Sequence, residues 1–428
     1  MAVMNKMLMA AGSLEDPSYW ISLAGTTRNN VAQGVVSDSN DNVYAAGYGV
    51  PEASSTFDDE AILYKWSNSG TLQFCRGISN LSTDDRYRAI AIDSSDNVYA
   101  VGDANSDAII AKYNSSGTSQ FFKSLSSLGL EVLSSAYIDS GNNLIVAGNT
   151  SGVALIAKYN SSGEVQWQRT LTPGSGNSSF NGVSGDSSDN YIAVGDDLTN
   201  GGALIAKYNS SGVLQWQRKL GSSDQEALAC VVDSSGNSYI AGVAELAPGS
   251  SDALVFKYNS SGVLQWQKTL TDSGQLNLAT GIALDSVNNI YVSGSRDRPV
   301  PVGIQATMSK YSNAGVLLFQ RSLDFDASFD ADDQSFGISI DSRQNVLWCG
   351  EAQNNAVSNF FNTFVAKLPR DGSLTGTYGP ATYAVSTMTS STSTFTSSTS
   401  TLTDSASTLT EATETPVQSG QFNFVTIQ

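Results

Sequence analysis

The stretches ALIAKYNSSGEVQW (154–167), ALIAKYNSSGVLQW (203–216) and ALVFKYNSSGVLQW (253–266) are three copies of one unit. A second shared element precedes each copy, as in VVDSSGNSYIAG (231–242). The turn glycine of the unit recurs seven times, at intervals of 47, 46, 49, 50, 53 and 57 residues: Gly70, Gly117, Gly163, Gly212, Gly262, Gly315 and Gly372. A period near fifty that is built from short strands is typical of a β-propeller.

Each unit contains four strand-like runs, which in the fifth unit read ALACVVD, NSYIAG, ALVFKY and VLQWQKTL. These runs are rich in the β-branched and aromatic residues that strands favour, and Asn, Asp and Gly dominate the turns between them. The sequence therefore predicts an all-β chain, a seven-bladed β-propeller of four-stranded antiparallel blades over residues 18–379. We name the strands of a blade A to D from the centre outward. We expect Tyr19–Leu23 to be strand D of the last blade, which closes the ring.

This topology gives the disc two unlike faces. The A–B and C–D turns share one face and are nearly identical in every unit, so we call it the constant face. The B–C and D–A loops share the opposite, variable face, where specificity is expected because loops on a rigid scaffold usually bind ligands. Five aromatic residues in these loops are candidates for stacking on sugar rings, although they can equally fold back onto the ring: Tyr48, Phe57, Tyr87, Phe325 and Phe329.

Two polar residues recur in all seven units, and we interpret both as structural. An Asp ends strand A at Asp38, Asp93, Asp139, Asp186, Asp233, Asp285 and Asp341. A Lys lies near the end of strand C at Lys65, Lys112, Lys158, Lys207, Lys257, Lys310 and Lys367. The pattern predicts either a bridge between the two side chains or an Asp that caps its own turn.

Composition excludes several classes of function. The net charge of −18 over 428 residues argues against binding to nucleic acid, which requires clustered Lys and Arg. No apolar run approaches the roughly 20 residues that a membrane-spanning helix needs. The apolar run in MAVMNKMLMAAGS (1–13) is short for a secretory signal, so we expect this segment to be retained. Cys75, Cys230 and Cys349 are expected to be buried thiols rather than a disulfide framework.

The chain contains no histidine, so it has no Ser-His-Asp triad and no His-based metal site. We find no motif for a nucleotide or another cofactor. From these observations we expect a protein that is not an enzyme and that needs no cofactor. One acidic loop offers a candidate calcium site, because calcium prefers clustered oxygen ligands: Asp324, Asp326, Asp330, Asp332 and Asp333.

After Pro380 the composition changes to Ser and Thr, in four heptads: STMTSST (386–392), STFTSST (393–399), STLTDSA (400–406) and STLTEAT (407–413). We expect residues 380–416 to form either a flexible linker or an ordered extended stalk whose apolar residues dock at regular intervals. Residues 417–428 are expected to act as a docking strand and residues 1–17 as an anchoring peptide. The candidate docking residues of the tail are Met388, Phe395, Leu402, Leu409, Phe422 and Phe424.

The unit DSSGN-x-Y-x-x-G followed by A-x-x-x-K-Y-x-x-x-G-x-x-x-W resembles the seven-bladed β-propeller (SBBP-type) repeat of bacterial and viral proteins. The start MNKMLMAAG (4–12) and the acidic, Ser/Thr-rich character also resemble virion proteins of tailed phages, particularly cyanophages. These resemblances imply a structural or binding component of a virion. Its partners would be other virion proteins, contacted through the termini, and a glycan or protein on the host surface, with homo-oligomers as a further option. The alternatives are an adhesin at the bacterial surface or secreted from the cell, and a polysaccharide-acting enzyme.

Overall fold

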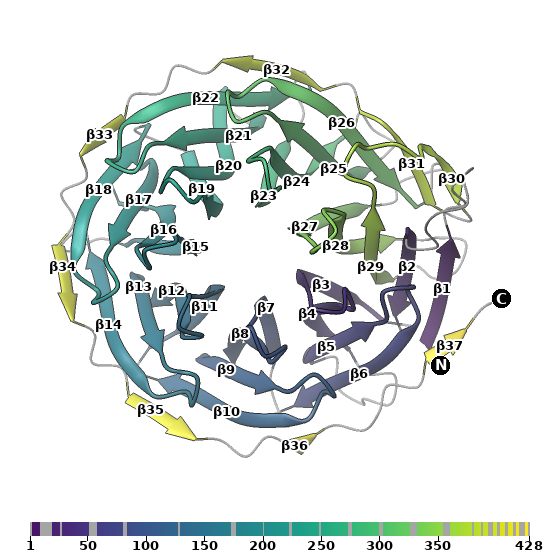
Figure 1. Ribbon diagram of the computed structural model, residues 1–428, viewed down its shortest axis with the longest axis horizontal. Coiled ribbons are helices and arrows are strands. Elements are labelled where there is room, and N and C mark those ends of the chain that lie inside the picture. Colours follow the sequence, from purple (N-terminus) through teal and green to yellow (C-terminus); the bar gives the residue numbers. More distant parts are fainter. Residues whose placement is uncertain are drawn as a thin grey trace.

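Seven sheets, each with four antiparallel blade strands, form a closed ring in this computed structural model, so the predicted seven-bladed β-propeller is confirmed (Figure 1). The structure describes residues 2–8, 19–25, 28–50, 58–79, 84–126, 129–172, 177–199, 201–221, 225–247, 250–272, 276–298, 303–325, 332–353, 360–378, 381–386, 388–392, 397–399, 403–406, 410–413, 417–418 and 424–426. All regular elements among these residues are strands, and none is a helix that could cross a membrane.

The first six blades each use four consecutive strands, because short Asn-, Asp- and Gly-containing turns connect neighbouring runs. Blade 1 contains β3 (Asn30–Ser37), β4 (Val43–Gly49), β5 (Glu60–Trp66) and β6 (Leu72–Ser79). Blade 2 contains β7 (Asp85–Ile92), β8 (Val98–Ala104), β9 (Asp107–Tyr113) and β10 (Ser119–Ser126). Blade 3 contains β11 (Glu131–Ile138), β12 (Leu144–Thr150), β13 (Val153–Tyr159) and β14 (Val165–Thr172). Blade 4 contains β15 (Ser179–Gly185), β16 (Tyr191–Asp196), β17 (Ala203–Tyr208) and β18 (Leu214–Leu220). Blade 5 contains β19 (Gln225–Val232), β20 (Ser238–Ala247), β21 (Ser250–Tyr258) and β22 (Leu264–Thr271). Blade 6 contains β23 (Asn277–Leu284), β24 (Ile290–Asp297), β25 (Ile304–Tyr311) and β26 (Leu317–Asp324).

The seventh blade joins the two ends of the chain. Its inner strands are β27 (Asp333–Ile340), β28 (Val346–Gln353) and β29 (Phe361–Leu368). The outer strand is β2 (Trp20–Gly25), which pairs antiparallel with β29, so the expected N-terminal closure is present. A further strand, β1 (Ala2–Leu8), pairs with the outer side of β2. Residues 2–8 thus belong to the sheet of blade 7 in this structure, and the anchoring role expected for residues 1–17 stays a prediction.

The core lies between neighbouring blades, where the apolar faces of two sheets meet. One cluster combines Ile205 of β17 in blade 4 with Leu254 of β21 in blade 5, and both side chains are fully buried. Burial of each such side chain contributes about 1.5–3 kcal/mol. Because every blade buries its faces against two neighbours, the ring is a rigid support for the loops on its two faces.

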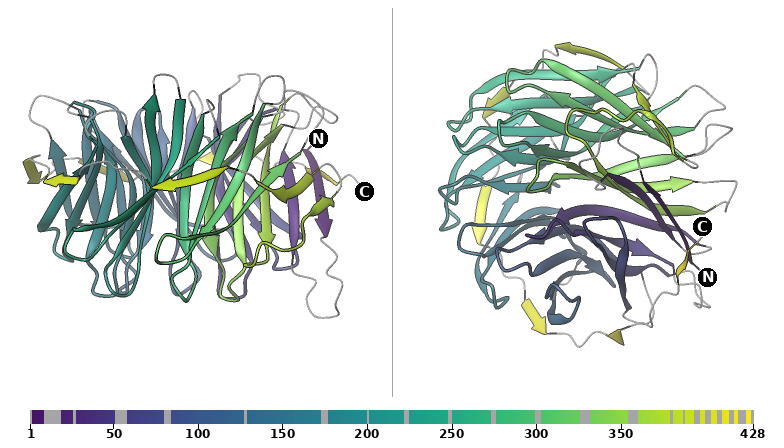
Figure 2. Two further views of the ribbon diagram at one scale, coloured as in Figure 1. Left: turned by 90° about the horizontal axis from the view of Figure 1, so that it is seen from above. Right: turned by 45° about the vertical axis from the view of Figure 1, so that its right-hand side comes forward.

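The tail forms short strands that lie along the outer wall of the ring (Figures 1 and 2). These strands are β30 (Gly376–Tyr378), β31 (Ala381–Val385), β32 (Thr389–Thr392), β33 (Ser397–Thr399), β34 (Thr403–Ala406), β35 (Thr410–Thr413), β36 (Val417–Gln418) and β37 (Phe424–Thr426). Apart from β30, which pairs with β31, these strands add to the chain's own strands D and to β1, because those edges offer unpaired backbone groups. The linker and stalk alternatives for residues 380–416 stay predictions.

Candidate functional site

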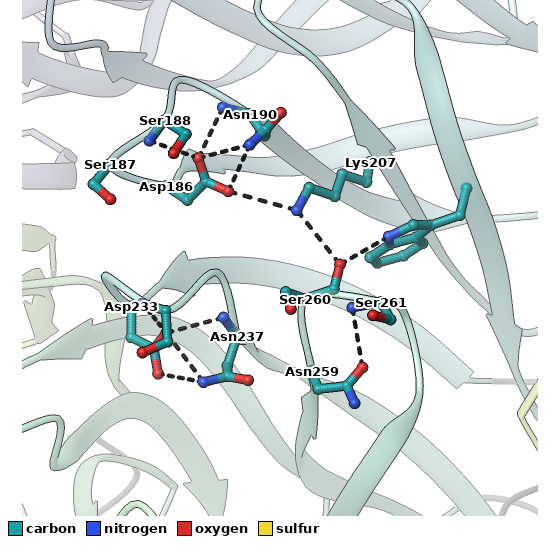
Figure 3. A network of polar contacts seen from close by, with 12 residues as sticks. Asp186, Ser187, Ser188, Asn190, Lys207, Asp233, Asn237, Asn259, Ser260 and Ser261 are labelled. Atoms are coloured by element: carbon teal, nitrogen blue, oxygen red, sulfur yellow. Dashed lines mark hydrogen bonds and ion pairs between the residues drawn. The ribbon is translucent and has the colours of Figure 1, made fainter.

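The sevenfold Asp organises the A–B turn on the constant face. In blade 4, Asp186 Oδ1 accepts hydrogen bonds from the backbone N–H groups of Ser188 and Asn190, both at 2.9 Å (Figure 3). Its Oδ2 accepts a third from Asn190 Nδ2 at 2.9 Å. Burial raises the pKa of Asp186, but these hydrogen bonds outweigh that effect and hold the pKa below its usual value. The Asp therefore fixes the turn, as one of the two structural interpretations predicted.

The sevenfold Lys joins each blade to the next. Lys207 Nζ lies 3.5 Å from Asp186 Oδ2 and donates to the carbonyl of Ser260, in the C–D turn of blade 5, at 3.4 Å (Figure 3). The bridge is thus present together with the cap. Six lysines make this ion pair within 4 Å: Lys65, Lys112, Lys158, Lys207, Lys310 and Lys367. Lys257 is the exception and donates to Asn313 Oδ1.

The same C–D turn also receives an aromatic side chain from the preceding blade. Trp216 Nε1 donates to the Ser260 carbonyl at 3.2 Å. Gly262 lies against this indole, where a Cβ atom would come within 2.9 Å of the ring, and its φ of +74° favours glycine. The repeated polar and aromatic residues of the constant face are therefore structural.

A cavity of about 360 Å³ lies in the central channel and is lined by strand A of all seven blades. Each strand A contains a β-bulge, whose extra residue has no partner in strand B. We call these seven residues the bulge ring, and all of them line the cavity: Gln33, Arg88, Ser134, Asn181, Leu228, Thr280 and Phe336. Their side chains all differ, although the blades around them are nearly uniform.

Beside each bulge, strand B has a glycine at the end of its apolar run, and its lack of a side chain permits the close approach of strand A. At Gly195, a Cβ atom would collide with the carbonyl oxygen of Ser179, just before the bulge of strand A. The equivalent collision occurs in the other blades, at Gly47, Gly102, Gly148, Gly242, Gly294 and Gly350. This glycine of strand B is distinct from the turn glycine between strands C and D. It also recurs seven times in the sequence, but its place beside a bulge was not predicted.

The bulge ring combines several kinds of chemistry. Asn181 Nδ2 donates to Asp196 Oδ1 at 2.5 Å and to the Ala227 carbonyl at 3.1 Å. Arg88 forms an ion pair with Asp103 and leaves 37% of its side chain exposed. Phe336 and Leu228 are the apolar members of the bulge ring, and Gln33, Ser134 and Thr280 are further polar members. The residues that line the cavity thus include one guanidinium, two amides, two hydroxyls and one aromatic ring. Of these groups, the Asn181 amide hydrogens and the Thr280 hydroxyl hydrogen already bind neighbouring acceptors.

A second group of polar residues lies on the variable face. Arg86 makes ion pairs with Asp59 at 2.7 Å and Asp84 at 2.8 Å, and its guanidinium lies 5.0 Å from the centre of the Tyr48 ring. Burial raises the pKa of Tyr48, and the nearby Glu351 raises it further. Burial, helped by Asp332, raises the pKa of Glu351 to about 7. A Tyr, an Arg and a carboxyl group that titrates near neutrality therefore lie close together.

The aromatic residues singled out in the variable loops differ in exposure. Tyr48 is half-buried beside Arg86. Tyr87 is fully buried and its hydroxyl lies 2.8 Å from that of Tyr113. Phe325 is also buried, with its ring centre 5.5 Å from that of Phe364. Tyr87 and Phe325 are thus core residues that no ligand can reach in this structure, whereas Phe57 and Phe329 lie outside the described residues.

The described carboxylates of the acidic loop accept hydrogen bonds from the backbone and form an ion pair with Arg298. Asp324 Oδ2 lies 2.7 Å from Arg298 Nη1, and Asp332 Oδ1 accepts from the Ile304 N–H at 2.8 Å. Asp333 Oδ2 accepts from the Phe325 N–H at 2.9 Å. No group of three or more metal-ligating side chains is present among the described residues. Two residues of the suggested calcium site, Asp326 and Asp330, lie outside them.

Neither a protein-family model nor a curated protein matches the chain. Similar solved structures include a protein from Lactobacillus plantarum (13% identity, 74% of this chain and 94% of the other, TM-score 0.44). A polysaccharide lyase, ulvan lyase, is 10% identical over 82% of this chain and 96% of its own, with a TM-score of 0.48. A gluconolactonase from Xanthomonas campestris is 10% identical over 86% and 98%, with a TM-score of 0.39. These likenesses concern the fold alone.

The comparisons correct one inference from the sequence. We expected a protein without enzymatic activity, because the chain has no histidine and no catalytic motif. Two of the similar propellers are named as enzymes, so this inference was wrong and an enzymatic role is compatible with the fold. The SBBP-type repeat and the likeness to phage proteins find no support in these comparisons and stay predictions.

Proposed function

We propose that the protein is a binding propeller whose bulge ring holds a sugar unit of a glycan. One observation carries the proposal: the seven bulge positions have seven different side chains in an otherwise repetitive ring, and all of them line one cavity. Repetition serves packing, whereas unlike groups that converge on a cavity serve recognition. The cavity volume of about 360 Å³ lies at the lower end of the range for small-ligand sites.

The chemistry of the bulge ring suits a sugar better than a purely apolar ligand. A sugar has a face of C–H groups that stacks on an aromatic ring, here Phe336, and a rim of hydroxyls. Arg88 can donate hydrogen bonds to such hydroxyls, and Gln33 can both donate and accept them. Both amide hydrogens of Asn181 are already bound by Asp196 and the Ala227 carbonyl, so Asn181 serves the site through its shape and its oxygen. The exposed part of Arg88 also favours a sugar with a carboxylate or sulfate group.

We place this binding propeller in the virion of a tailed phage, where it binds a host-surface glycan and contacts other virion proteins. It does so either as a monomer or as a homo-oligomer. The support is the character of the sequence, namely the start at 4–12 and the acidic, Ser/Thr-rich composition. An adhesin at the bacterial surface is the alternative location. Mass spectrometry of purified phage particles tests the placement, which fails if the protein is found only in host envelope fractions.

The binding proposal is tested by titrating the full chain with a library of bacterial surface oligosaccharides. Phe336→Ala and Arg88→Gln remove the stacking surface and the cation, so each is expected to weaken binding at least tenfold, or about 1.4 kcal/mol. Val287→Ala, at an exposed position of an A–B turn on the constant face, is the control and should bind as the wild type does. Equal affinity of all four proteins, or no binding of any oligosaccharide, would contradict the proposal.

A second candidate is a polysaccharide-acting enzyme, which the grouping of Tyr48, Arg86 and Glu351 favours. A carboxyl group with a pKa of about 7 can give or take a proton at neutral pH, as general acid–base catalysis requires. Incubation with anionic and neutral polysaccharides, followed by chromatography of the products, tests this activity. Glu351→Gln should abolish depolymerisation, whereas the same change at the exposed Glu164 on the constant face should not. Activity that survives Glu351→Gln would refute the role of this site.

A further inference from the structure

The tail pairs with the outer wall in a regular register. Strand D of each of the first six blades has an apolar residue opposite an alanine of strand C, and this residue pairs with one tail residue. Along the tail, the pairs are Leu323 with Tyr383, Leu270 with Ser390, Leu220 with Ser397, Leu171 with Asp404, Leu125 with Glu411 and Ile78 with Gln418. Successive tail partners are seven residues apart in every case. The heptad of the tail therefore corresponds to one blade.

The final step links the tail to the start of the chain. Seven residues after Gln418 comes Val425 of β37, which pairs in parallel with Val3 of β1. The β1 strand in turn pairs with β2, the outer strand of blade 7. The tail thus passes blades 6, 5, 4, 3, 2 and 1 in order and ends on the sheet of blade 7 (Figure 1).

One apolar residue of the heptad is described in atomic detail. Met388, the third residue of its heptad, is 6% exposed and packs in a cluster that contains residues of blades 5 and 6, such as Leu270 and Tyr311. Its carbonyl accepts from Gln320 Nε2 at 2.7 Å. Near it, the hydroxyls of Ser391 and Thr269 lie 2.8 Å apart. The tail therefore makes side-chain contacts where two blades meet, in addition to its backbone pairing.

We propose that the C-terminal tail is a strap with a length of one heptad per blade, and that its natural acceptor is the outer wall of its own ring. Seven residues of extended chain span roughly 23 Å, which covers three or four paired residues and the gap to the next blade. Phe395, Leu402 and Leu409 hold the third heptad position but lie, like Phe422, outside the described residues; the heptad rule predicts that these three dock as Met388 does. The strap occupies the strand edges that would otherwise accept a strand from another chain.

Hydrogen exchange measured by mass spectrometry on the full chain tests the heptad rule. Deletion of one residue, Ser393, shifts all later heptads out of phase, so the outer strands β18, β14 and β10 should lose protection. Deletion of the whole heptad 393–399 keeps the phase, so these three strands should stay protected while β1, which β37 no longer reaches, exchanges faster. The length-neutral change Thr394→Ser is the control. Equal exchange of β18, β14 and β10 in both deletion variants and the control would overturn the proposal.

A second experiment keeps the length of the chain and identifies the acceptor. Val3→Cys and Val425→Cys place two thiols on the paired strands β1 and β37. A short thiol-reactive cross-linker should join them within one molecule, giving a compact monomer on a denaturing gel at all protein concentrations. Cross-linked dimers and larger ladders would show that the strap binds a second copy, and absence of any cross-link would show that it does not reach β1. Either result overturns the proposal, even if the deletion variants fail to fold.

Discussion

Substitution of Lys367 by Met is expected to destabilise the ring far more than the same change at Lys257. Lys367 and its partner Asp341 are both fully buried, with Nζ and Oδ2 2.9 Å apart. Lys367 Nζ also donates to Asn68 Oδ1 at 2.5 Å and so ties blade 7 to blade 1. Methionine fills most of the same space but leaves the Asp341 carboxylate buried without its cation. Removal of one partner of a buried pair costs about 3–5 kcal/mol.

Lys257 holds the same place in blade 5 and is a matched control. It is half-buried, it makes no ion pair within 4 Å with Asp233 among the described residues, and its main contact is with Asn313. Asp233 is buried, but it lies beyond ion-pair distance of Lys257 and accepts hydrogen bonds from Ser235, Asn237 and Tyr239. The change of Lys257 to Met should therefore cost about 1 kcal/mol, typical of a single hydrogen bond. Urea titrations followed by tryptophan fluorescence give both values. Equal losses in the two variants would refute the argument that burial of the Asp341–Lys367 pair decides the cost.

Four further outcomes are expected. Burial raises the pKa values of Asp139, Asp186 and Asp285, but hydrogen bonds to these carboxylates lower the values by more. Their stabilising effect is therefore complete above the ordinary pKa of 3.8 and is lost as the pH falls through the lowered values. The urea concentration at the midpoint of unfolding should decrease when the pH is lowered below about 4. The raised pKa of Glu351 has the opposite effect on stability. The stability that its protonated form contributes is complete below the ordinary pKa of 4.5 and is lost as the pH rises through about 7. Glu351→Gln should therefore unfold at a higher urea concentration than the wild type at pH 8 but not at pH 4. Gly195→Ala, which forces a Cβ atom against the Ser179 carbonyl, should cost about 1–3 kcal/mol in the same titration, whereas Gly141→Ala, next to the flexible end of a side chain, should cost less. Burial raises the pKa of Cys349 to about 12, so this thiol should react with a disulfide reagent only when urea unfolds the ring; rapid reaction in buffer would contradict its burial.

The ring was predictable because the repeated residues of each blade contact equivalent residues in the neighbouring blades. The Asp of each blade caps its own A–B turn, the Lys contacts the next blade, and the turn glycine contacts an aromatic ring of the preceding blade. The glycine–aromatic contact recurs at every boundary and the Asp–Lys ion pair in six blades, so the sequence repeats these residues. Closure by β2 was predictable for the same reason, because the segment around Trp20 has the pattern of a strand D that lacks a blade of its own.

The site and the tail were not predictable in the same way. The bulge ring has no repeated residue type, and Arg88 or Phe336 stands out only when the cavity is seen. The heptads of the tail were recognised, but a single apolar residue in seven does not say what it docks against. Seven residues match one blade only through the spacing of neighbouring strands D along the outer wall, which is a property of the folded ring.

The position of the strap after the last blade in the sequence has a consequence for synthesis. Ribosomes add about 5–20 residues per second, so the 48 residues from 381 to 428 take roughly 2–10 s to make after the last blade has emerged. During that interval a nascent ring has bare strand edges all around its circumference, and any strand from a neighbouring polysome is a competitor for them. A message truncated within the tail would therefore yield a protein that is sound at its centre and prone to aggregate from its perimeter.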